Sequence, residues 1–396
     1  MEEIRMQPDG DRRRRVREAL AVARLDAFVC RLPENVVLLT GCYPIIGQTW
    51  VVYPQTGEPT LIVPAQEAYL AEDCSLDDVR PYECGRIGDP TPVETCARLL
   101  RQVCQGKGLV DKAIGYEDSP EVVAPPQAAA EPLFVGQATV ALLQEAFGSG
   151  LRPADELFTQ LKSVKTPAEV TRLSRTNEIA CVGLSVFKDE AQPGRRETEV
   201  AAAVERAIYS RGVGFKGAFS ARAWAQVMSG PNTETAWYYP VSKERRIQPG
   251  DLVLIELATV VDGYWSDLTR TVVAGKASDR QREVHQLVLD AQAADLLAAR
   301  PGARGDEVDA AGRRLIVERG LGDNFVHHTG HGVGFRYHEP RPWLHPDSRQ
   351  TLVVGHVHTI EPGIYIPGFG GIRVEDDAVV LREGAEFLSH TDFGLD

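Results

Sequence analysis

The chain has 396 residues, 43 Lys and Arg against 56 Asp and Glu, a formal charge of −13 and 43% hydrophobic residues. This composition is globular, and the length favours two domains. The acidity argues against polyanion binding, and no run approaches the roughly 18 apolar residues of a membrane helix. We therefore expect a soluble, cytoplasmic protein without nucleic-acid or membrane partners.

Cysteines and histidines are distributed unevenly. The seven cysteines are an odd number without a C-x-x-C pair, which favours reduced thiols. All nine histidines lie at or after His285, and seven lie between His327 and His358. Chemistry that uses imidazoles is therefore expected in the second half of the chain.

The first part of the chain has the pattern of a small α/β domain. A helical pattern follows Arg15, and short apolar runs typical of strands come next, at 26–30, 35–41, 49–54 and 59–64. A Pro- and Ala-rich segment at 124–136 and a stretch with Gly and Pro at 147–156 indicate its end. We place the boundary near Pro153, giving domains of 1–155 and 156–396.

Long amphipathic helices begin at Thr166. The sequence Thr166-Pro167-Ala168-Glu169 combines an N-cap, a first-turn proline and a capping-box glutamate, so a helix is expected to start there. Further helices are predicted at 197–210, 278–299 and 306–319, and strands at 251–261, 264–274, 356–366 and 371–381. The second domain is expected to be α+β, with helices over a mostly antiparallel sheet.

Asp262-Gly263 predicts a two-residue hairpin between the first two of these strands. In that register Ala258 faces Asp267, and Glu256 is a diagonal neighbour of Asp267 on the same face, roughly 7–8 Å away. Two inward carboxylates among Val, Leu and Ile are costly unless a cation neutralises them. For this pair alone, one acid facing solvent at a sheet edge stays an alternative.

Glu361 and Glu375 form a second acidic pair, each within a β-branched run. Because Asp376 and Asp377 follow Glu375, a charged strand end is the alternative, and only the hydrophobic flanks favour Glu375 as the buried member.

Residues 327–334 read His-His-Thr-Gly-His-Gly-Val-Gly. The glycines disfavour a helical zinc pair, and the motif has neither an H-E-x-x-H pattern nor the strand–turn–helix context of a nucleotide loop. A glycine-rich strand that presents His331 remains, with a structural histidine as the alternative.

Four carboxylates and one imidazole without thiolates form a hard ligand set that suits paired manganese, cobalt or zinc ions. Two such ions can share and activate a water. The sequence therefore predicts a hydrolase.

The order Glu256, Asp267, His331, Glu361, Glu375 resembles the pita-bread metallopeptidases of the creatinase/prolidase/aminopeptidase P family. The resemblance lies in 249–273, 327–340, 360–366 and 371–377, and the 43.4 kDa mass is similar to that of the shorter bacterial Xaa-Pro dipeptidases. It implies an α+β pita-bread domain behind a smaller α/β creatinase-type domain. It also implies Xaa-Pro dipeptide hydrolysis, two divalent ions with manganese preferred over cobalt or zinc, and a homodimer.

The resemblance further implies ligand roles. Asp267 and Glu375 would bridge both ions, Glu256 would complete one site, and His331 with Glu361 would complete the other. Glu361 would also carry a proton from the bridging water to the proline nitrogen.

Four other residues match substrate-facing positions of the family. His338 would steady the scissile carbonyl, and His327 would face the substrate. Arg373 would orient carboxylates. Arg341 would take a substrate carboxylate, with an ordinary loop arginine as the alternative.

Two features depart from the family. Glu256 stands where an aspartate is usual, which puts metal affinity at that position in question. Residues 234–248 lack the usual histidine, so Tyr238 or Tyr239 would replace its hydrogen bond, unless these rings only pack under the sheet.

Three other functions compete with the dipeptidase. An aminopeptidase P would cleave longer Xaa-Pro peptides, and a creatinase-like hydrolase would cleave a small non-peptide amide. A catalytically silent peptide-binding module is the third. Retention of all five ligand positions favours the peptidase.

Overall fold

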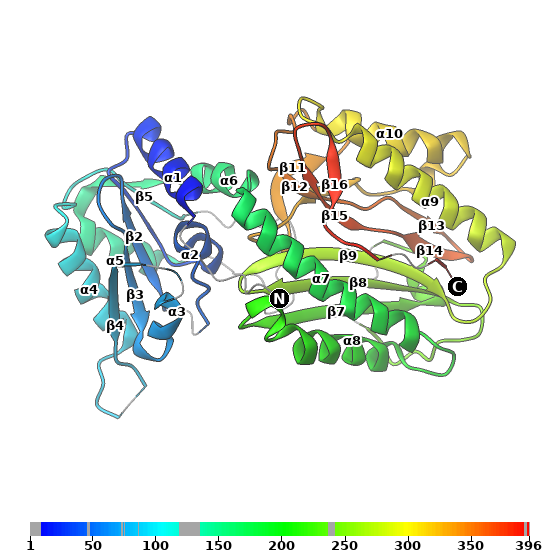
Figure 1. Cartoon of the computed structure of the whole chain (residues 1–396), viewed down its shortest axis with the longest axis horizontal. Coiled ribbons are helices and arrows are strands. Elements are labelled where there is room, and N and C mark those ends of the chain that lie inside the picture. The colour runs from blue at the N-terminus through cyan, green and yellow to red at the C-terminus, as the bar shows by residue number, and fades with distance from the viewer. Residues whose placement is uncertain are drawn as a thin grey trace. The chain divides into compact units, whose positions relative to one another are not determined.

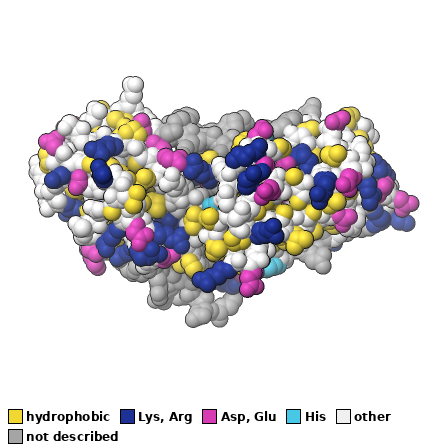
Figure 2. All heavy atoms as spheres, turned by 90° about the horizontal axis from the view of Figure 1, so that it is seen from above, with side chains coloured by type: hydrophobic (Ala, Val, Ile, Leu, Met, Phe, Trp, Pro, Cys, Tyr) yellow, Lys and Arg dark blue, Asp and Glu magenta, His cyan; other side chains and the backbone are white. Residues whose placement is uncertain are grey.

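A computed structural model describes residues 9–45, 48–72, 74, 76–85, 87–118, 135–236, 242–391 and 394–395. The chain forms two compact units, of residues 4–162 and 163–396. The predicted boundary between residues 155 and 156 lies in the first turn of helix α6 (Asp155–Ser163). In the described residues, no helix is both long and apolar enough to cross a membrane. Basic and acidic side chains are interspersed on the face in Figure 2.

The first unit contains a six-stranded sheet in the order β4-β3-β2-β1-β5-β6 (Figure 1). Its strands are β1 (Ala27–Cys30), β2 (Trp50–Pro54), β3 (Thr60–Pro64), β4 (Asp78–Tyr82), β5 (Ile114–Tyr116) and β6 (Leu151–Pro153). Its helices, besides α6, are α1 (Gly10–Ala23), α2 (Pro33–Thr40), α3 (Ala68–Glu72), α4 (Pro92–Gly106) and α5 (Gln137–Phe147). Parallel and antiparallel pairs both occur, so the predicted α/β class is confirmed for this unit.

Two local predictions for this unit are wrong. The apolar run at 35–41 forms helix α2 instead of a strand. Pro33 occupies its first turn, and the Glu117 carboxylate accepts hydrogen bonds from the backbone N–H groups of Arg31 and Leu32, at 2.7 and 2.9 Å. The cysteines are not all reduced, because a disulfide joins Cys42 and Cys74.

The second unit packs helices against antiparallel sheets. Figure 1 shows α7 and α8 along the sheet β7-β8-β9, and α9 and α10 beside the remaining strands. The helices are α7 (Pro167–Glu190), α8 (Glu197–Gly212), α9 (Asp279–Ala298) and α10 (Gly305–Glu318). Strands β7 (Ala221–Ser229), β8 (Leu252–Val261) and β9 (Tyr264–Val273) form one sheet. A five-stranded sheet has the order β11 (Glu339–Leu344), β10 (Gly330–Gly332), β12 (Val357–Ile360), β15 (Asp376–Val380) and β16 (Ala385–Phe387), and β13 (Gly363–Ile366) pairs with β14 (Gly370–Arg373). The predicted α+β class is confirmed.

The β8–β9 hairpin has the predicted register. Asp262 and Gly263 both have positive φ, 52° and 87°, as a two-residue type I′ turn requires. Ala258 pairs with Asp267, and Glu256 pairs with Thr269. Glu256 and Asp267 therefore lie on one face of the sheet, as predicted.

The two C-terminal strand predictions need correction, because each predicted strand is two strands. β12 ends at Ile360 and β13 begins at Gly363, while β14 ends at Arg373 and β15 begins at Asp376. Pro362 has no N–H group for a ladder, which explains the first break. Glu361 lies in the break between β12 and β13, and Glu375 lies in the break between β14 and β15. Both acidic residues therefore lie outside the regular strands.

Candidate metal centre

Three buried carboxylates converge between two sheets. One oxygen each from Glu256 on β8, Asp267 on β9 and Glu375 lies within 4.8 Å of the others. Glu375 reaches this point because its backbone pairs with Thr269 of β9, with N···O distances of 3.0 and 3.3 Å. The Thr269 hydroxyl also donates to Glu375 Oε2 at 2.6 Å.

The carboxylates are incompletely satisfied. Among the described residues, no group donates a hydrogen bond to either oxygen of Asp267 or to Glu375 Oε1. Burying such acceptors without partners is costly, and a charged carboxylate costs more than a neutral group. A cation among the three would supply the missing interaction.

The pKa shifts show the same imbalance. Burial raises the pKa of Glu375 to about 8, and Glu361 adds to the effect by repulsion. Burial, followed by repulsion from Glu375 and Glu361, holds the Asp267 pKa well above its usual range. Protons take the place of a cation in the metal-free protein, and a bound ion would displace them.

His331 of β10 has the form that a metal ligand needs. Its Nδ1–H donates to the Gly332 carbonyl at 2.9 Å, and burial holds its pKa well below the usual value, so the ring is neutral with a lone pair on Nε2. That atom lies 3.5 Å from Asp267 Oδ2 and 3.5 Å from Glu361 Oε1. A cation between these three atoms could bind the nitrogen lone pair and both carboxylates, and in the metal-free protein protons on the carboxyls take its place.

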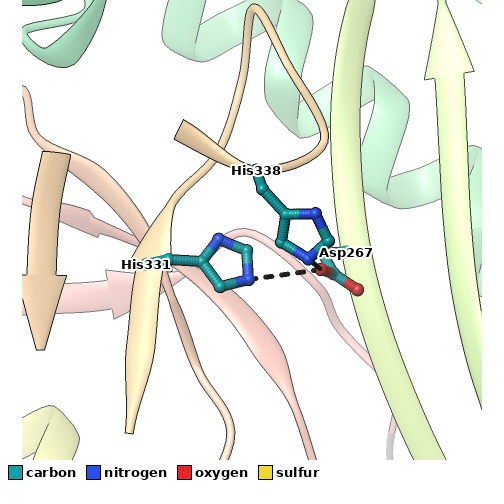
Figure 3. Close-up of side chains that lie close together, drawn as sticks. All are labelled: Asp267, His331 and His338. Atoms are coloured by element: carbon teal, nitrogen blue, oxygen red, sulfur yellow. Dashed lines mark ion pairs between the residues drawn. The ribbon is translucent and has the colours of Figure 1, made fainter. Parts of the chain in front are cut away.

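His338 joins this cluster from the loop before β11. Figure 3 shows the His331 and His338 rings turned toward the Asp267 carboxylate. His338 Nε2 is 3.7 Å from Asp267 Oδ2, and the two ring centroids are 4.4 Å apart. Burial lowers the His338 pKa to about 3, so this imidazole is neutral as well.

Glu361 lies beside the same His331 nitrogen, close to a histidine that the sequence did not single out. His328 Nε2 is 3.5 Å from Glu361 Oε1, and ligand atoms of these two residues and His331 lie within 4.8 Å of one another. Burial raises the Glu361 pKa to about 8. The family resemblance pointed to His327, and only the richness of the motif in histidine could have pointed to His328.

His327 is engaged at both ring nitrogens. Its Nδ1–H donates to the His328 carbonyl at 2.8 Å, so Nε2 is the acceptor for the Tyr365 hydroxyl at 3.0 Å. Arg373 Nη1 donates to that hydroxyl at 2.8 Å. His327 is therefore the end of a hydrogen-bond chain that begins at Arg373.

The same arginine holds the carboxylate cluster. Arg373 Nε donates to the Thr269 hydroxyl at 3.1 Å, and its Nη2 contacts Glu256 Oε2. This is the kind of contact expected of a residue that orients carboxylates. Arg341 lies on β11 and is partly exposed. Tyr238 and Tyr239 lie outside the described residues.

A cavity of about 280 Å³ adjoins the centre through His327 and His328. The other residues that line it are Arg313, Phe325, Val326, Trp343, His345 and Pro346. Arg313 is bound to Asp309 at 2.7 and 2.8 Å, so its charge is already compensated. The wall that remains is aromatic and imidazole-rich, and suits an apolar or aromatic group.

Oxygen and imidazole donors of this kind fit divalent ions such as manganese, cobalt or zinc. The neutral His331 nitrogen and the oxygens of Asp267 and Glu375 that accept no hydrogen bond are atoms that could bind such ions. The described site is therefore suited to holding divalent metal ions.

Comparison with known proteins extends over both units. Metallopeptidase family M24 matches residues 171–382, and the creatinase/prolidase N-terminal domain matches residues 12–161. The Xaa-Pro dipeptidase of Pyrococcus furiosus is 39% identical over 238 residues, 60% of this chain and 66% of that protein, just under two thirds of its length. That of Pyrococcus horikoshii is 31% identical over 370 residues, 93% of each chain.

Solved structures agree in fold. The prolidase from Pyrococcus horikoshii superposes with a TM-score of 0.76 at 26% identity, covering 98% of this chain and 100% of that one. The Xaa-Pro dipeptidase from Bacillus anthracis gives 0.78 at 26% identity, covering 97% and 98%. The expected pita-bread fold behind a creatinase-type domain is thereby confirmed, and the chain belongs to metallopeptidase family M24.

Proposed function

We propose that this protein hydrolyses the Xaa-Pro bond of dipeptides with two divalent metal ions. The observation that carries the proposal is the neutral His331, whose Nε2 lone pair faces Asp267 and Glu361 among further buried carboxylates. The relatives named Xaa-Pro dipeptidase support the substrate class.

In this proposal Asp267 and Glu375 would be shared by the two ions, which is supported by the oxygens of both residues that accept no hydrogen bond among the described residues. Glu256 would help to hold one ion, and His331 and Glu361 would help to hold the other. The ions supply an activated water and an electrophile for the scissile carbonyl.

The remaining chemistry falls to side chains. Glu361 would take up the proton that the attacking water loses and pass it to the departing proline nitrogen. His338 lies beside Asp267 and would donate to the carbonyl oxygen as charge develops there, for which its neutral ring must carry a proton on the nitrogen that faces the substrate. His327 would face the substrate from the Tyr365–Arg373 chain.

Selectivity for proline has a physical basis. The nitrogen of a bond before proline carries no hydrogen, so peptidases that need this N–H as a hydrogen-bond donor bind such substrates poorly. A site that does not need the donor can accept them. We assign Arg341 to the substrate carboxylate, and Tyr238 or Tyr239 to the hydrogen bond that a histidine makes in relatives. Manganese as the native metal, with cobalt or zinc as alternatives, the homodimer and a cytoplasmic location are further proposals that rest on the family resemblance.

The test uses metal-stripped protein titrated with manganese. Hydrolysis of Ala-Pro, Met-Pro and a longer Xaa-Pro-Xaa peptide is followed, with Ala-Ala as the control because its bond keeps the N–H. Cleavage of the two Xaa-Pro dipeptides, with little cleavage of Ala-Ala, is expected. Preference for the longer peptide would reassign the activity to an aminopeptidase P, and no cleavage with metal bound would overturn the proposal.

A further inference from the structure

Glu256 is held by two donors that approach its two oxygens separately. The Tyr337 hydroxyl donates to Oε1, and Arg373 contacts Oε2. The hydroxyl also lies close enough to Asp267 to lower the pKa of that carboxyl, against the larger effect of burial, which raises it. An ionised carboxylate has about four lone-pair sites, so these contacts leave room for a metal ion, mainly at Oε1, because Oε2 also lies 3.4 Å from the Thr269 hydroxyl. The two donors therefore fix the direction of the carboxylate without consuming it.

The position of the phenol is set independently of Glu256. The Tyr337 ring is buried, 6.5 Å from the Trp224 ring on β7 and 6.2 Å from the Trp265 ring on β9, between centroids. The His338 ring lies 4.1 Å away. A ring packed against three others cannot follow a moving carboxylate, so the carboxylate must take the position that the hydroxyl offers.

Side-chain length makes this contact consequential. Glutamate has one more rotatable bond than aspartate, so its carboxylate can leave the cluster unless partners hold it. The contact also depends on that length, because an aspartate at position 256 would withdraw its oxygens toward β8 and away from the phenol.

We propose that Tyr337 is a positioning residue that aims the Glu256 carboxylate at Asp267 and Glu375 and thereby sets the affinity of the ion that Glu256 binds. The inference rests on the proposed function in so far as both place metal ions at this cluster. It concerns the Tyr337 hydroxyl, because the ring alone would suffice for packing.

The test is a double-mutant cycle on the metal-stripped protein, titrated with Co²⁺ and followed by calorimetry and by visible absorption of the bound ion. Tyr337→Phe keeps the ring but removes the hydroxyl. The affinity for the ion that Glu256 binds should fall by roughly 10–100-fold, which is the usual effect of removing a partner that orients a metal ligand. The absorption of that ion should change, while the ion at His331 keeps its affinity. In a Glu256→Asp background, Tyr337→Phe should change the affinity by less than about twofold, because the contact is already lost.

Tyr264→Phe is the matched control. This buried tyrosine of β9 receives a hydrogen bond from Arg172 at 3.0 Å, so the variant also removes a buried hydroxyl, and its Co²⁺ affinities should equal those of the wild type. Unchanged Co²⁺ affinity and absorption in Tyr337→Phe would overturn the inference, as would an equal loss in the Glu256→Asp background. The outcomes are separable from those for the proposed function, because a wild type that binds Co²⁺ but cleaves no Xaa-Pro peptide contradicts only the activity.

Discussion

A buried ion pair supports the loop that carries His338. Lys165 Nζ lies 2.7 Å from Glu339 Oε2, with side chains 0% and 2% exposed, and the other Glu339 oxygen accepts from the Phe335 N–H at 2.7 Å. Lys165→Met would leave this carboxylate buried without its cation, which costs about 3–5 kcal/mol. The pair itself contributes less than that, because both charges lost their hydration on folding.

The double variant separates these two quantities. Lys165→Met with Glu339→Gln removes both charges, and the amide oxygen of the new glutamine can still accept from the Phe335 N–H. We expect the free energy of unfolding to fall by about 1–3 kcal/mol, because the amide N–H groups are left without partners. The double variant should therefore be more stable than Lys165→Met alone. Arg280→Met, which breaks the exposed pair with Glu283, is the control and should cost under about 1 kcal/mol.

Urea unfolding of the metal-free protein measures these changes. Four of the five tryptophans, at 224, 237, 265 and 343, belong to the unit of residues 163–396, so fluorescence follows mainly that unit. A loss below 1 kcal/mol in Lys165→Met would refute the uncompensated-charge argument. A double variant as unstable as the sum of the single variants would show that the two side chains are not coupled.

Two further predictions concern the metal centre. His331→Ala should abolish turnover and the binding of one ion while circular dichroism stays unchanged, and full retained activity would show that the ligand assignment is wrong. The pKa values of Glu361 and Glu375, about 8, exceed the unfolded value of 4.5, so the folded metal-free protein holds more protons than the unfolded chain between these pH values. Its free energy of unfolding should fall as pH rises from 7.5 to 8.5, by at most about 1.4 kcal/mol per pH unit for each carboxyl, since unfolded histidines are already neutral there. Urea unfolding measures this change, and loading with manganese should remove it. A free energy of unfolding of the metal-free protein that stays constant or rises from pH 7.5 to 8.5 would contradict the pKa assignment.

Local signals accounted for what could be predicted. The Asp262-Gly263 turn fixes the hairpin register by itself, so the shared face of Glu256 and Asp267 followed from sequence. Capping residues located the start of α7 in the same way. The α2 helix was missed because its partner, Glu117, is more than 80 positions away in the chain.

Long-range hydrogen bonds explain why the residue pattern alone predicted the carboxylates, whereas their different roles came only from the family resemblance. Glu256 receives Tyr337 from 81 positions away, Glu375 receives Thr269 from 106 positions away, and no described group donates to Asp267. A carboxylate with a donor at each oxygen is directed toward one side, whereas one with an oxygen that accepts no hydrogen bond has more lone pairs open to ions. The pattern of donors therefore supports Asp267 and Glu375 as the ligands shared by two ions in the proposal, and Glu256 as the ligand of a single ion. The donors that make this distinction are distant in the chain.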